Sequence, residues 1–428
     1  MLVASVLALA VSACQQEPVA RKPNVVVILI DTLRPDHLGF YGYERETAPF
    51  LARLAKRSFV FRNAFSTTSW TAPATASLFT SLYPTQHGVT NGWFAHANAE
   101  LETESKITLN RITSDVRTLP ELFHDAHYAT FGLAGNINIG PELGFDRGFE
   151  VFDHHHAAQA NELYAELLEW EPKLREKQPY FLYLHLMDPH APYYQHMPWF
   201  EEQPTELGHR RAAYDSEITY ADYMLARAYE HFGWDTGTIL VVLSDHGEEF
   251  LDHGAWQHSF RLYRELTRIL LIVRPADGPA VGRTVDENVS IVDVLPTLLE
   301  LVGAKPPDGR EGRSLVPLLR ARDGVPPTLR SRMLFGHRVR PVGTDQLWST
   351  IHDEWQLIEG PHGPELYDFR ADPGEKRNRA GDRPDVVTTL HAQLEGFHAR
   401  DGGHRSERGT VPIDHKTLEQ LKALGYVD

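Results

Sequence analysis

The 428-residue sequence contains a single cysteine, Cys14. One cysteine cannot form a disulfide within the chain, and no other cysteine exists to act as a nucleophile or metal ligand. The sequence also lacks an excess of basic residues, because its formal net charge is −16. This balance disfavours general nucleic-acid binding, which requires a basic surface, so we expect no nucleic-acid partner. It does not exclude an anionic substrate, since a bound metal ion can supply positive charge locally.

Long apolar runs are also missing, and the one at the N-terminus is short. The run from Leu2 to Ala13 is too short to span a bilayer as a helix, which is typical of a signal peptide. It ends in the sequence VSAC, which resembles the lipobox of bacterial lipoproteins. The resemblance implies a signal peptide over residues 1–13, lipidation of Cys14 and a tether over residues 14–23. No Lys or Arg precedes the apolar run, so an ordinary cleaved signal with an incidental cysteine is the alternative.

If the lipobox interpretation holds, the protein is anchored to a membrane by lipid. We then expect a cell-envelope lipoprotein that faces the periplasm and is held at the outer membrane.

Shorter apolar runs, rich in β-branched residues, predict buried strands. They lie at Asn24–Ile30, Tyr180–Met187, Thr238–Leu243 and Arg268–Val273. Between them, apolar residues at helical spacing predict helices at Ala74–Leu82, Ala212–Phe232 and Ile291–Val302. Alternating strands and helices predict an α/β fold with a mostly parallel central sheet and helices on both faces.

The character of the sequence changes after Ala304, where Pro and Gly residues mark a stretch rich in loops. Short strand patterns follow at Met333–His337, Gln346–His352 and Trp355–Glu359. We therefore predict a catalytic domain over residues 24–304 and a small α+β subdomain over residues 305–428 that completes the fold. The run of three histidines at 154–156 is interpreted as a solvated loop, with metal binding as the less favoured alternative.

Acidic and imidazole side chains closely follow three of the predicted strands. Asp31, Asp188 and the pair Asp245–His246 occupy these positions. Ligands of open α/β sheets bind beyond the carboxyl ends of the strands, so these side chains are expected at one edge. Each alone could be a helix-capping aspartate or a satisfied core histidine.

A hydroxyl group also stands at the start of a predicted helix. Thr71 precedes Pro73 by two residues, in the sequence SWTAPATASL. A helix N-terminus offers free N–H groups to an anion, so the position suits a nucleophile as well as a helix cap. A threonine hydroxyl reacts only when a base or a metal activates it.

Together these features resemble the sulfatase branch of the alkaline phosphatase superfamily. The segments that carry the resemblance follow the family's order along the chain, at residues 24–43, 71–88, 144–149, 181–193, 244–254, 290–303 and 365–378. The resemblance implies that Asp31, Asp245, His246 and Thr71 bind one divalent metal ion. The oxygen-rich ligand set suits Mn²⁺, Mg²⁺, Ca²⁺ or Zn²⁺.

Catalytic roles follow by position in the same way. The resemblance implies that Thr71 is the nucleophile and that His190 or His258 protonates the leaving group. Further contacts to an anionic ester substrate are expected from Asn136, Asp188, His253 and Thr75.

The sequence departs from the family at the nucleophile. Sulfatases convert a Cys or Ser to formylglycine within a Cys-x-Pro-x-Arg motif, whereas Thr71 and Thr75 occupy the first and last motif positions here. A threonine ester cannot eliminate to an aldehyde and must be opened by water. This chemistry favours phosphate or phosphonate esters, and the missing arginine favours a singly charged group.

Three alternatives remain open from the sequence. The first is a sulfate-ester hydrolase that works without formylglycine, and the second is a phosphoryl transferase acting on envelope glycans or lipids. The third is an inactive binding lipoprotein.

Overall fold

The computed structural model describes residues 22–93, 106–279, 281–321, 329–338, 346–401, 407–413, 415 and 418–419. The predicted signal peptide and Cys14 lie outside these residues. None of the described helices combines the length and the apolar composition that a bilayer-crossing segment requires.

A nine-stranded sheet forms the centre of the molecule. Its order is β10-β2-β11-β7-β1-β6-β4-β5, and β12 pairs with β2. The bounds are β1 Asn24–Ile30, β2 Phe59–Phe65, β4 Ala129–Ala134, β5 Val151–His154, β6 Tyr180–Leu186, β7 Thr238–Leu243, β10 Arg268–Ile269, β11 Leu271–Arg274 and β12 Arg283–Ser290. The pairs of β1 with β6 and β7, of β4 with β5 and β6, and of β12 with β2 are parallel. This confirms the predicted mostly parallel sheet.

One predicted strand differs in detail. The run Arg268–Val273 forms two strands, β10 and β11, and both are antiparallel to their neighbours. The break falls at Leu270, whose backbone exchanges hydrogen bonds with the backbone and hydroxyl of Ser244. An apolar run does not reveal strand direction, so this reversal was not predictable from the sequence.

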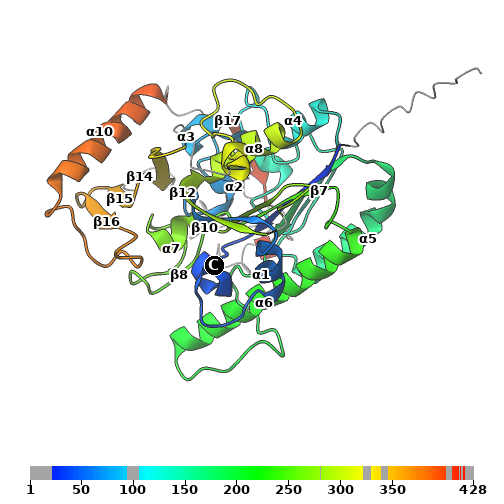
Figure 1. Cartoon of the computed structure of the whole chain (residues 1–428), viewed down its shortest axis with the longest axis horizontal. Helices are drawn as coiled ribbons and strands as arrows, with labels where there is room; N and C mark the ends of the chain where they lie inside the picture. Colours follow the sequence, from blue (N-terminus) through cyan, green and yellow to red (C-terminus); the bar gives the residue numbers. More distant parts are fainter. Residues whose placement is uncertain are drawn as a thin grey trace, which may run out of the picture.

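Helices cover both faces of the sheet. Successive side chains of β1 alternate between two hydrophobic cores, one on each face. Val25, Val27 and Leu29 pack in one core with α2 (Thr71–Thr80), α4 (Leu119–Asp125) and α8 (Val294–Leu301). The intervening residues of β1 pack in a second core with α1 (Pro49–Ala55), α5 (Ala160–Glu176) and α6 (Glu206–Phe232). Figure 1 shows the two helical layers on opposite sides of the sheet. The predicted two-sided α/β fold is confirmed.

A second, smaller sheet lies in the C-terminal part. It is antiparallel, in the order β13 (Leu334–Arg338), β14 (Leu347–His352), β15 (Trp355–Glu359) and β16 (Glu365–Asp368), beside α10 (Pro384–Arg400). In Figure 1, β15, β16 and α10 are the orange elements, and β14 lies beside them. This sheet and helix agree with the predicted C-terminal α+β elements, while the exact domain boundary at residue 304 remains a prediction.

The small sheet also contacts the loop that precedes α2. The backbone N–H of His337 in β13 donates to the carbonyl oxygen of Thr67, at 2.8 Å. The C-terminal part therefore supports the segment that leads into Thr71.

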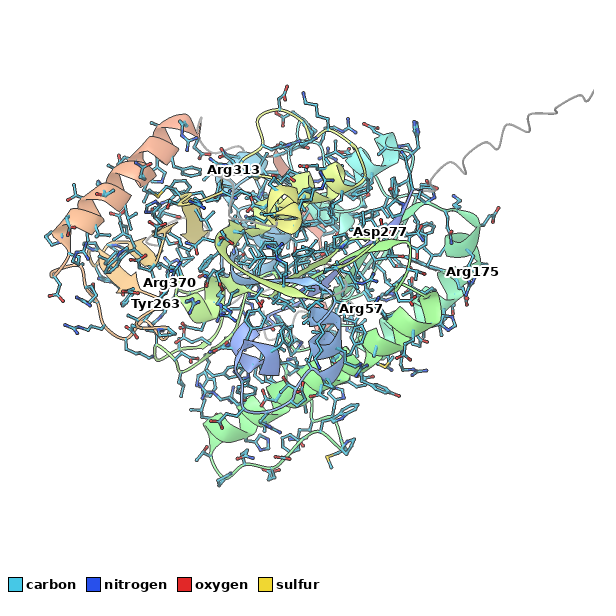
Figure 2. The ribbon with its side chains drawn as sticks, viewed as in Figure 1. Arg57, Arg175, Tyr263, Asp277, Arg313 and Arg370 are labelled. Atoms are coloured by element: carbon cyan, nitrogen blue, oxygen red, sulfur yellow. The ribbon has the colours of Figure 1, made fainter. Side chains whose placement is uncertain are left out.

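Charged side chains of both signs cover the outside. Arg57, Arg175, Asp277, Arg313 and Arg370, which Figure 2 labels, are all exposed. Charged side chains of both signs are thus exposed to solvent.

Candidate active site

The structure gathers Asp31, Thr71, Asp245 and His246 into one cluster at the carboxyl edge of the central sheet. The hydroxyl oxygen of Thr71 lies 3.2 Å from Nε2 of His246 and 3.5 Å from Oδ1 of Asp31. The same Nε2 lies 3.3 Å from Oδ2 of Asp245 and 3.8 Å from Oδ1 of Asp31. All four side chains are buried. Groups from distant parts of the sequence therefore face one small volume.

Parallel pairing explains why these residues meet. Leu29 in β1 is paired with Leu243 in β7, so the chain leaves both strands at the same edge. Asp31 follows β1 directly, and Asp245 follows β7 after one residue. Residues beyond the carboxyl ends of adjacent parallel strands are neighbours in space.

Thr71 reaches the cluster from the first turn of α2. The residue before the helix is Trp70, and no side chain caps the helix there. Thr71 is the first helical residue, and its hydroxyl contacts His246 and Asp31 instead of the helix backbone. The structure therefore contradicts the helix-cap alternative.

The two carboxylates of the cluster, Asp31 and Asp245, repel each other. Burial would raise the pKa of Asp31, but a hydrogen bond from His185 and the nearby His190 and His246 hold it below its ordinary value. Burial and the charge of Asp31 raise the pKa of Asp245 to about 7. Two buried acids that repel each other in this way would be stabilised by a cation between them.

The chemistry of the cluster fits a divalent metal ion. Oδ2 of Asp245 is buried and has no hydrogen-bond partner among the described residues. The Nδ1–H of His246 donates to the carbonyl oxygen of Gly247 at 2.8 Å, which leaves the lone pair of Nε2 facing the carboxylates. Asp31, Asp245 and His246 present ligand atoms that all lie within 4.8 Å of one another. This arrangement supports the predicted ligand set.

Asp31 is oriented from behind by two further residues. Its Oδ2 accepts a hydrogen bond from Nδ2 of Asn136 at 2.6 Å and lies 3.1 Å from Nε2 of His185. The other ring nitrogen of His185 lies 2.9 Å from the hydroxyl of Tyr183. Asn136, predicted as a substrate contact, thus touches the carboxylate of a predicted metal ligand.

The contact of His185 with Asp31 was missed in the sequence. The signal was present, because His185 is a polar residue near the end of a buried apolar run, and β6 lies beside β1.

Two more imidazoles adjoin the cluster. The ring of His258 lies 4.6 Å from that of His246 and 5.0 Å from that of His190. The Nδ1 of His258 lies 3.0 Å from Oε1 of Glu248, and Nδ1 of His190 donates to the carbonyl oxygen of Ala191. Nε2 of His190 is buried without a hydrogen-bond partner in the described part of the chain. Both predicted proton donors therefore lie next to the cluster.

Glu248 is a second residue that the sequence did not single out. Burial would raise the pKa of its carboxyl group, but the adjacent His258 lowers it below the ordinary value. An ionised Glu248 orients the ring of His258, much as a carboxylate orients a catalytic histidine.

Three predicted substrate contacts have other neighbours. Asp188 accepts a hydrogen bond from the backbone of Ala160 and faces a different carboxylate. His253 lies 2.6 Å from Glu265 and 3.0 Å from the carbonyl oxygen of Glu375, so it joins the loop after β7 to the C-terminal part. Thr75 is buried one turn along α2 from Thr71, beside Tyr183. The structure thus does not bring Asp188 or His253 into the cluster.

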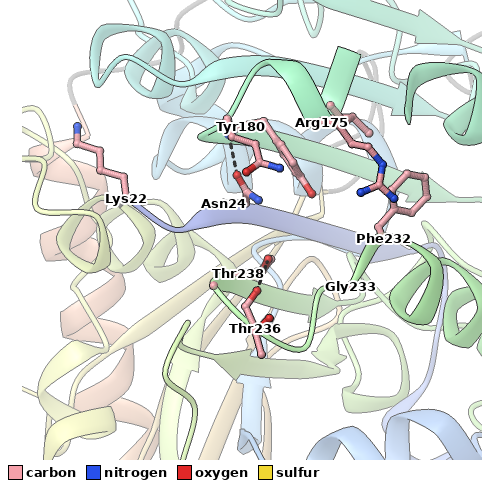
Figure 3. A pocket seen from close by; sticks show the side chains of 11 residues that line it. Lys22, Asn24, Arg175, Tyr180, Phe232, Gly233, Thr236 and Thr238 are labelled. Carbon is pink, nitrogen blue, oxygen red and sulfur yellow. Dashed lines mark hydrogen bonds between the residues drawn. The ribbon is translucent and has the colours of Figure 1, made fainter. Parts of the chain in front are cut away.

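A separate cavity of about 260 Å³ lies at the opposite edge of the sheet. Figure 3 shows it beside Asn24, Tyr180 and Thr238, which begin β1, β6 and β7. One dashed line marks the 3.1 Å hydrogen bond from the Tyr180 backbone to the Asn24 side chain, and the other marks the bond from the Thr238 hydroxyl to the carbonyl oxygen of Thr236. Because the predicted reactive groups follow the other ends of these strands, this cavity is not the candidate active site.

Comparison with known proteins agrees with this geometry. The model of the Sulfatase family matches residues 23–304, and that of the N-sulphoglucosamine sulphohydrolase C-terminal family matches residues 252–400. An ulvan-active sulfatase of Formosa agariphila is 25% identical over 434 residues, covering 88% of this chain and 81% of that protein.

Two other similar proteins have broader or different activities. The multifunctional alkaline phosphatase superfamily protein PehA of Trinickia caryophylli is 24% identical to this chain. The alignment covers 84% of this chain and 92% of PehA. The phosphonate monoester hydrolase of Agrobacterium radiobacter shares the fold with a TM-score of 0.72 at 19% identity, covering 90% of this chain and all of that one (100%).

Proposed function

The chain belongs to the sulfatase family and is an ester hydrolase, and from this premise we propose that Thr71 is its nucleophile. We further propose that its substrate is a phosphate or phosphonate ester with one negative charge. The observation that carries the proposal is the position of the Thr71 hydroxyl, 3.2 Å from Nε2 of His246 and beside Asp31. No other side chain of the cluster is a nucleophile of the alcohol or thiol type.

Members of this superfamily are generally metal-dependent, and the ligand set here fits one divalent ion. Asp31, Asp245, His246 and Thr71 would hold it. When bound, the ion lowers the pKa of the hydroxyl and offsets negative charge on the ester. The choice among Mn²⁺, Mg²⁺, Ca²⁺ and Zn²⁺ is left to metal analysis.

The side chains then divide the reaction between them. Thr71 reacts as the alkoxide, after its hydroxyl proton has passed to solvent. Its oxygen attacks phosphorus in line, and the bond from phosphorus to the leaving oxygen breaks. His258, held by Glu248, or the neighbouring His190 gives its proton to that leaving oxygen. The product of this step is a threonine ester of the phosphoryl group, whose alcohol has departed.

Water completes the cycle by attacking phosphorus and releasing the Thr71 oxygen. The histidine that gave its proton in the first step accepts one from this water, as microscopic reversibility requires. An alcohol in place of water would make the same enzyme a phosphoryl transferase.

Charge selectivity follows from the residues around Thr71. Thr75 occupies the motif position where the family carries arginine, and it is neutral and fully buried. The groups that lower the pKa of Asp31 are the imidazoles of His185, His190 and His246, and none is a guanidinium. A site without a guanidinium compensates a monoanion better than a dianion. The fold shared with a phosphonate monoester hydrolase, whose named substrate is of this kind, supports the choice.

A sulfate-ester hydrolase that needs no formylglycine is the second candidate. Sulfate monoesters also carry one charge, and the similarity to a sulfatase extends over 88% of this chain. A threonine sulfate would have to be opened by water at sulfur.

A panel of four substrates separates these candidates. We expect an aryl phosphonate and a bis-aryl phosphate to turn over faster than an aryl phosphate or an aryl sulfate. Thr71→Ala should lower kcat/KM by about 10³-fold or more, because it removes the attacking oxygen. Thr71→Ser should retain activity. Thr80→Ser, on the same helix but hydrogen-bonded to the carbonyl oxygen of Ala76, is the matched control and should behave as the native protein.

Two results would contradict the proposal. Unchanged turnover by Thr71→Ala would remove the nucleophile assignment, and a clear preference for the aryl sulfate would establish the second candidate. Mass spectrometry of protein quenched during turnover should find the phosphoryl adduct on the peptide containing Thr71.

We also propose that the chain is lipidated at Cys14 and faces the periplasm from the outer membrane. The support is the lipobox-like sequence before Cys14. Cys14→Ala should move the protein from the membrane fraction to the soluble fraction, and an unchanged distribution would contradict the anchor.

A further inference from the structure

A second group of acidic and imidazole side chains lies between the loop after β6 and helix α6. It consists of Asp188, His196 and Glu217, whose ligand atoms all lie within 4.8 Å of one another. Asp188 is 3% exposed and Glu217 is 1% exposed. The proposed reaction uses none of the three residues.

The two carboxylates of this group face each other without a compensating cation. After burial, the charge of Glu217 is the main cause that raises the pKa of Asp188. No Lys or Arg of the described residues forms an ion pair with either carboxylate, and Nε2 of His196 lies 3.3 Å from Oε2 of Glu217. Burial of two like charges is costly unless a cation or a shared proton compensates them.

One oxygen of the group has no protein partner. Oδ2 of Asp188 accepts the backbone N–H of Ala160, but Oδ1 is buried with no hydrogen-bond partner among the described residues. Glu217 accepts the backbone N–H of Tyr194 through Oε1, and its Oε2 faces His196. Oδ1 of Asp188, which has no hydrogen-bond partner among the described residues, therefore lies in the same cluster as the carboxylate of Glu217 and the imidazole of His196.

A neighbouring aspartate on α6 shows what a compensated carboxylate looks like. Asp215, two residues before Glu217, lies 2.7 Å from His37, accepts from Tyr43 at 2.8 Å and pairs with Arg45 at 3.0 Å. It is as deeply buried as Asp188, yet both of its oxygens have partners. The contrast shows that burial alone does not leave a carboxylate unpaired in this protein.

The space beside the pair has the size of one bound particle. A cavity of about 20 Å³ is lined by Asp188, Glu217, Tyr194 and His190. A volume of roughly 10–15 Å³ of this kind already holds one water molecule. The cavity has room for one ion beside the two carboxylates, while His196 contacts Glu217 from outside this lining.

We propose that Asp188, His196 and Glu217 bind a second divalent cation, separate from the one at Asp31, Asp245 and His246. Two carboxylates with one imidazole suit Zn²⁺ or Mn²⁺ better than Ca²⁺. The ion joins the loop over residues 188–196 to helix α6. His190 lies in this loop, with its ring 5.0 Å from that of His258, so the ion fixes the position of a proposed proton donor.

Metal content measures the proposal directly and independently of catalysis. The full-length protein is stripped with a chelator, reloaded with Zn²⁺ or Mn²⁺, dialysed and analysed by mass spectrometry for metal. We expect two equivalents in the native protein and one in Asp188→Asn/Glu217→Gln. We expect Asp245→Asn to retain one equivalent as well, because the second site is intact in that variant. Loss of both sites should require the triple variant.

Matched controls separate this result from nonspecific binding and from misfolding. Asp153→Asn/Glu166→Gln changes a cluster of the same composition at the surface and should retain two equivalents. His196→Gln removes the ligand that is 14% exposed, so it should fold and should release one equivalent more readily. Added Zn²⁺ should raise the Tm of Asp245→Asn and leave that of the triple variant unchanged.

The opposite results would overturn the proposal. Two equivalents in Asp188→Asn/Glu217→Gln would place the second ion elsewhere. One equivalent in the native protein and none in Asp245→Asn would show that Asp188 and Glu217 share a proton instead. Neither result would affect the role of Thr71, which the substrate panel tests separately.

Discussion

The two ends of helix α2 lie in polar surroundings that look alike in the sequence but differ in their bonding. At the first turn, Thr71 faces Asp31, Asp245 and His246, where Oδ2 of Asp245 has no hydrogen-bond partner among the described residues. Farther along, Ser77 accepts from the hydroxyl of Thr67 at 2.8 Å and lies 3.1 Å from Nε2 of His87. Both sets are buried.

The difference separates a ligand site from a structural network. Around Ser77 the protein supplies every partner, since Nδ1 of His87 also accepts the backbone N–H of Val89 at 3.2 Å. Around Thr71, Nε2 of His246 faces Oδ1 of Asp31 and Oδ2 of Asp245, and the latter oxygen has no donor among the described residues to pair it. Buried polar groups are normally hydrogen-bonded, so an incomplete set indicates that something else completes it. Changes at the first end should therefore affect binding and catalysis, and changes at the second should affect stability.

The largest effect is expected for Asp245→Asn. The variant should lose the ion at this cluster and about 10³-fold or more of kcat/KM, since a neutral amide replaces an anionic ligand. In metal-free protein, however, the same change removes a carboxylate that Asp31 repels. We therefore expect the metal-free variant to have a Tm equal to or above that of the metal-free native protein. A lower metal-free Tm, measured by calorimetry, would assign Asp245 a structural role.

An intermediate effect is expected for Asn136→Ala. The change removes the 2.6 Å hydrogen bond to Oδ2 of Asp31 and leaves His185 as the remaining partner of that oxygen. Loss of such an orienting contact typically weakens metal affinity by about 10- to 100-fold. Competition with a chelator measures this affinity. If the affinity is unchanged and KM alone rises, Asn136 contacts substrate, as the sequence predicted.

The contents of the site could be predicted from the sequence better than their arrangement. Asp31, Asp245 and His246 were predictable because each follows a recognisable buried strand, and parallel strands end at one edge. His253 lies between Asp252 and Gly254 in the same loop, yet its ring turns to Glu265 and Glu375. Loop conformation decides which way such a side chain points, and no periodicity encodes it.

Several strands were also beyond the reach of pattern reading. In β12, only Val285, Val289 and Ser290 are buried, and the strand is irregular between Val285 and Asn288. A half-exposed, irregular strand lacks the continuous apolar run that marked β1 and β7. Glu248 was missed because its partner, His258, lies ten residues farther along in a loop, and no periodic pattern links the two residues.

A smaller effect, on stability alone, is expected for His87. Burial lowers the pKa of this imidazole to about 3, because the charged form is poorly solvated in the core. In the unfolded chain a histidine takes up its proton near pH 6.5, so the unfolded state binds more protons between pH 6.5 and 3. Native stability therefore falls as the pH drops below 6.5, by at most about 1.4 kcal/mol per pH unit from this group.

His87→Gln tests that sign. The variant should be less stable than the native protein at pH 7.5, by about 1–3 kcal/mol, because buried hydrogen bonds are lost. Its stability should then fall less steeply than that of the native protein between pH 6.5 and 4.5. Urea unfolding at several pH values measures both quantities, and parallel pH profiles would contradict the assignment. Metal content at pH 7.5 should not change.

The smallest effect is expected at Asp153, His155 and Glu166, where the same residue types meet at the surface. His155 is 42% exposed and lies close to Glu166, so water can reach this pair. Exposed ion pairs contribute about 0–1 kcal/mol, and no unpaired buried oxygen requires a cation there. Asp153→Asn/Glu166→Gln should therefore leave metal content, kcat/KM and Tm unchanged within error. Loss of a metal equivalent would mean that composition, not incomplete buried bonding, marks the metal sites of this protein.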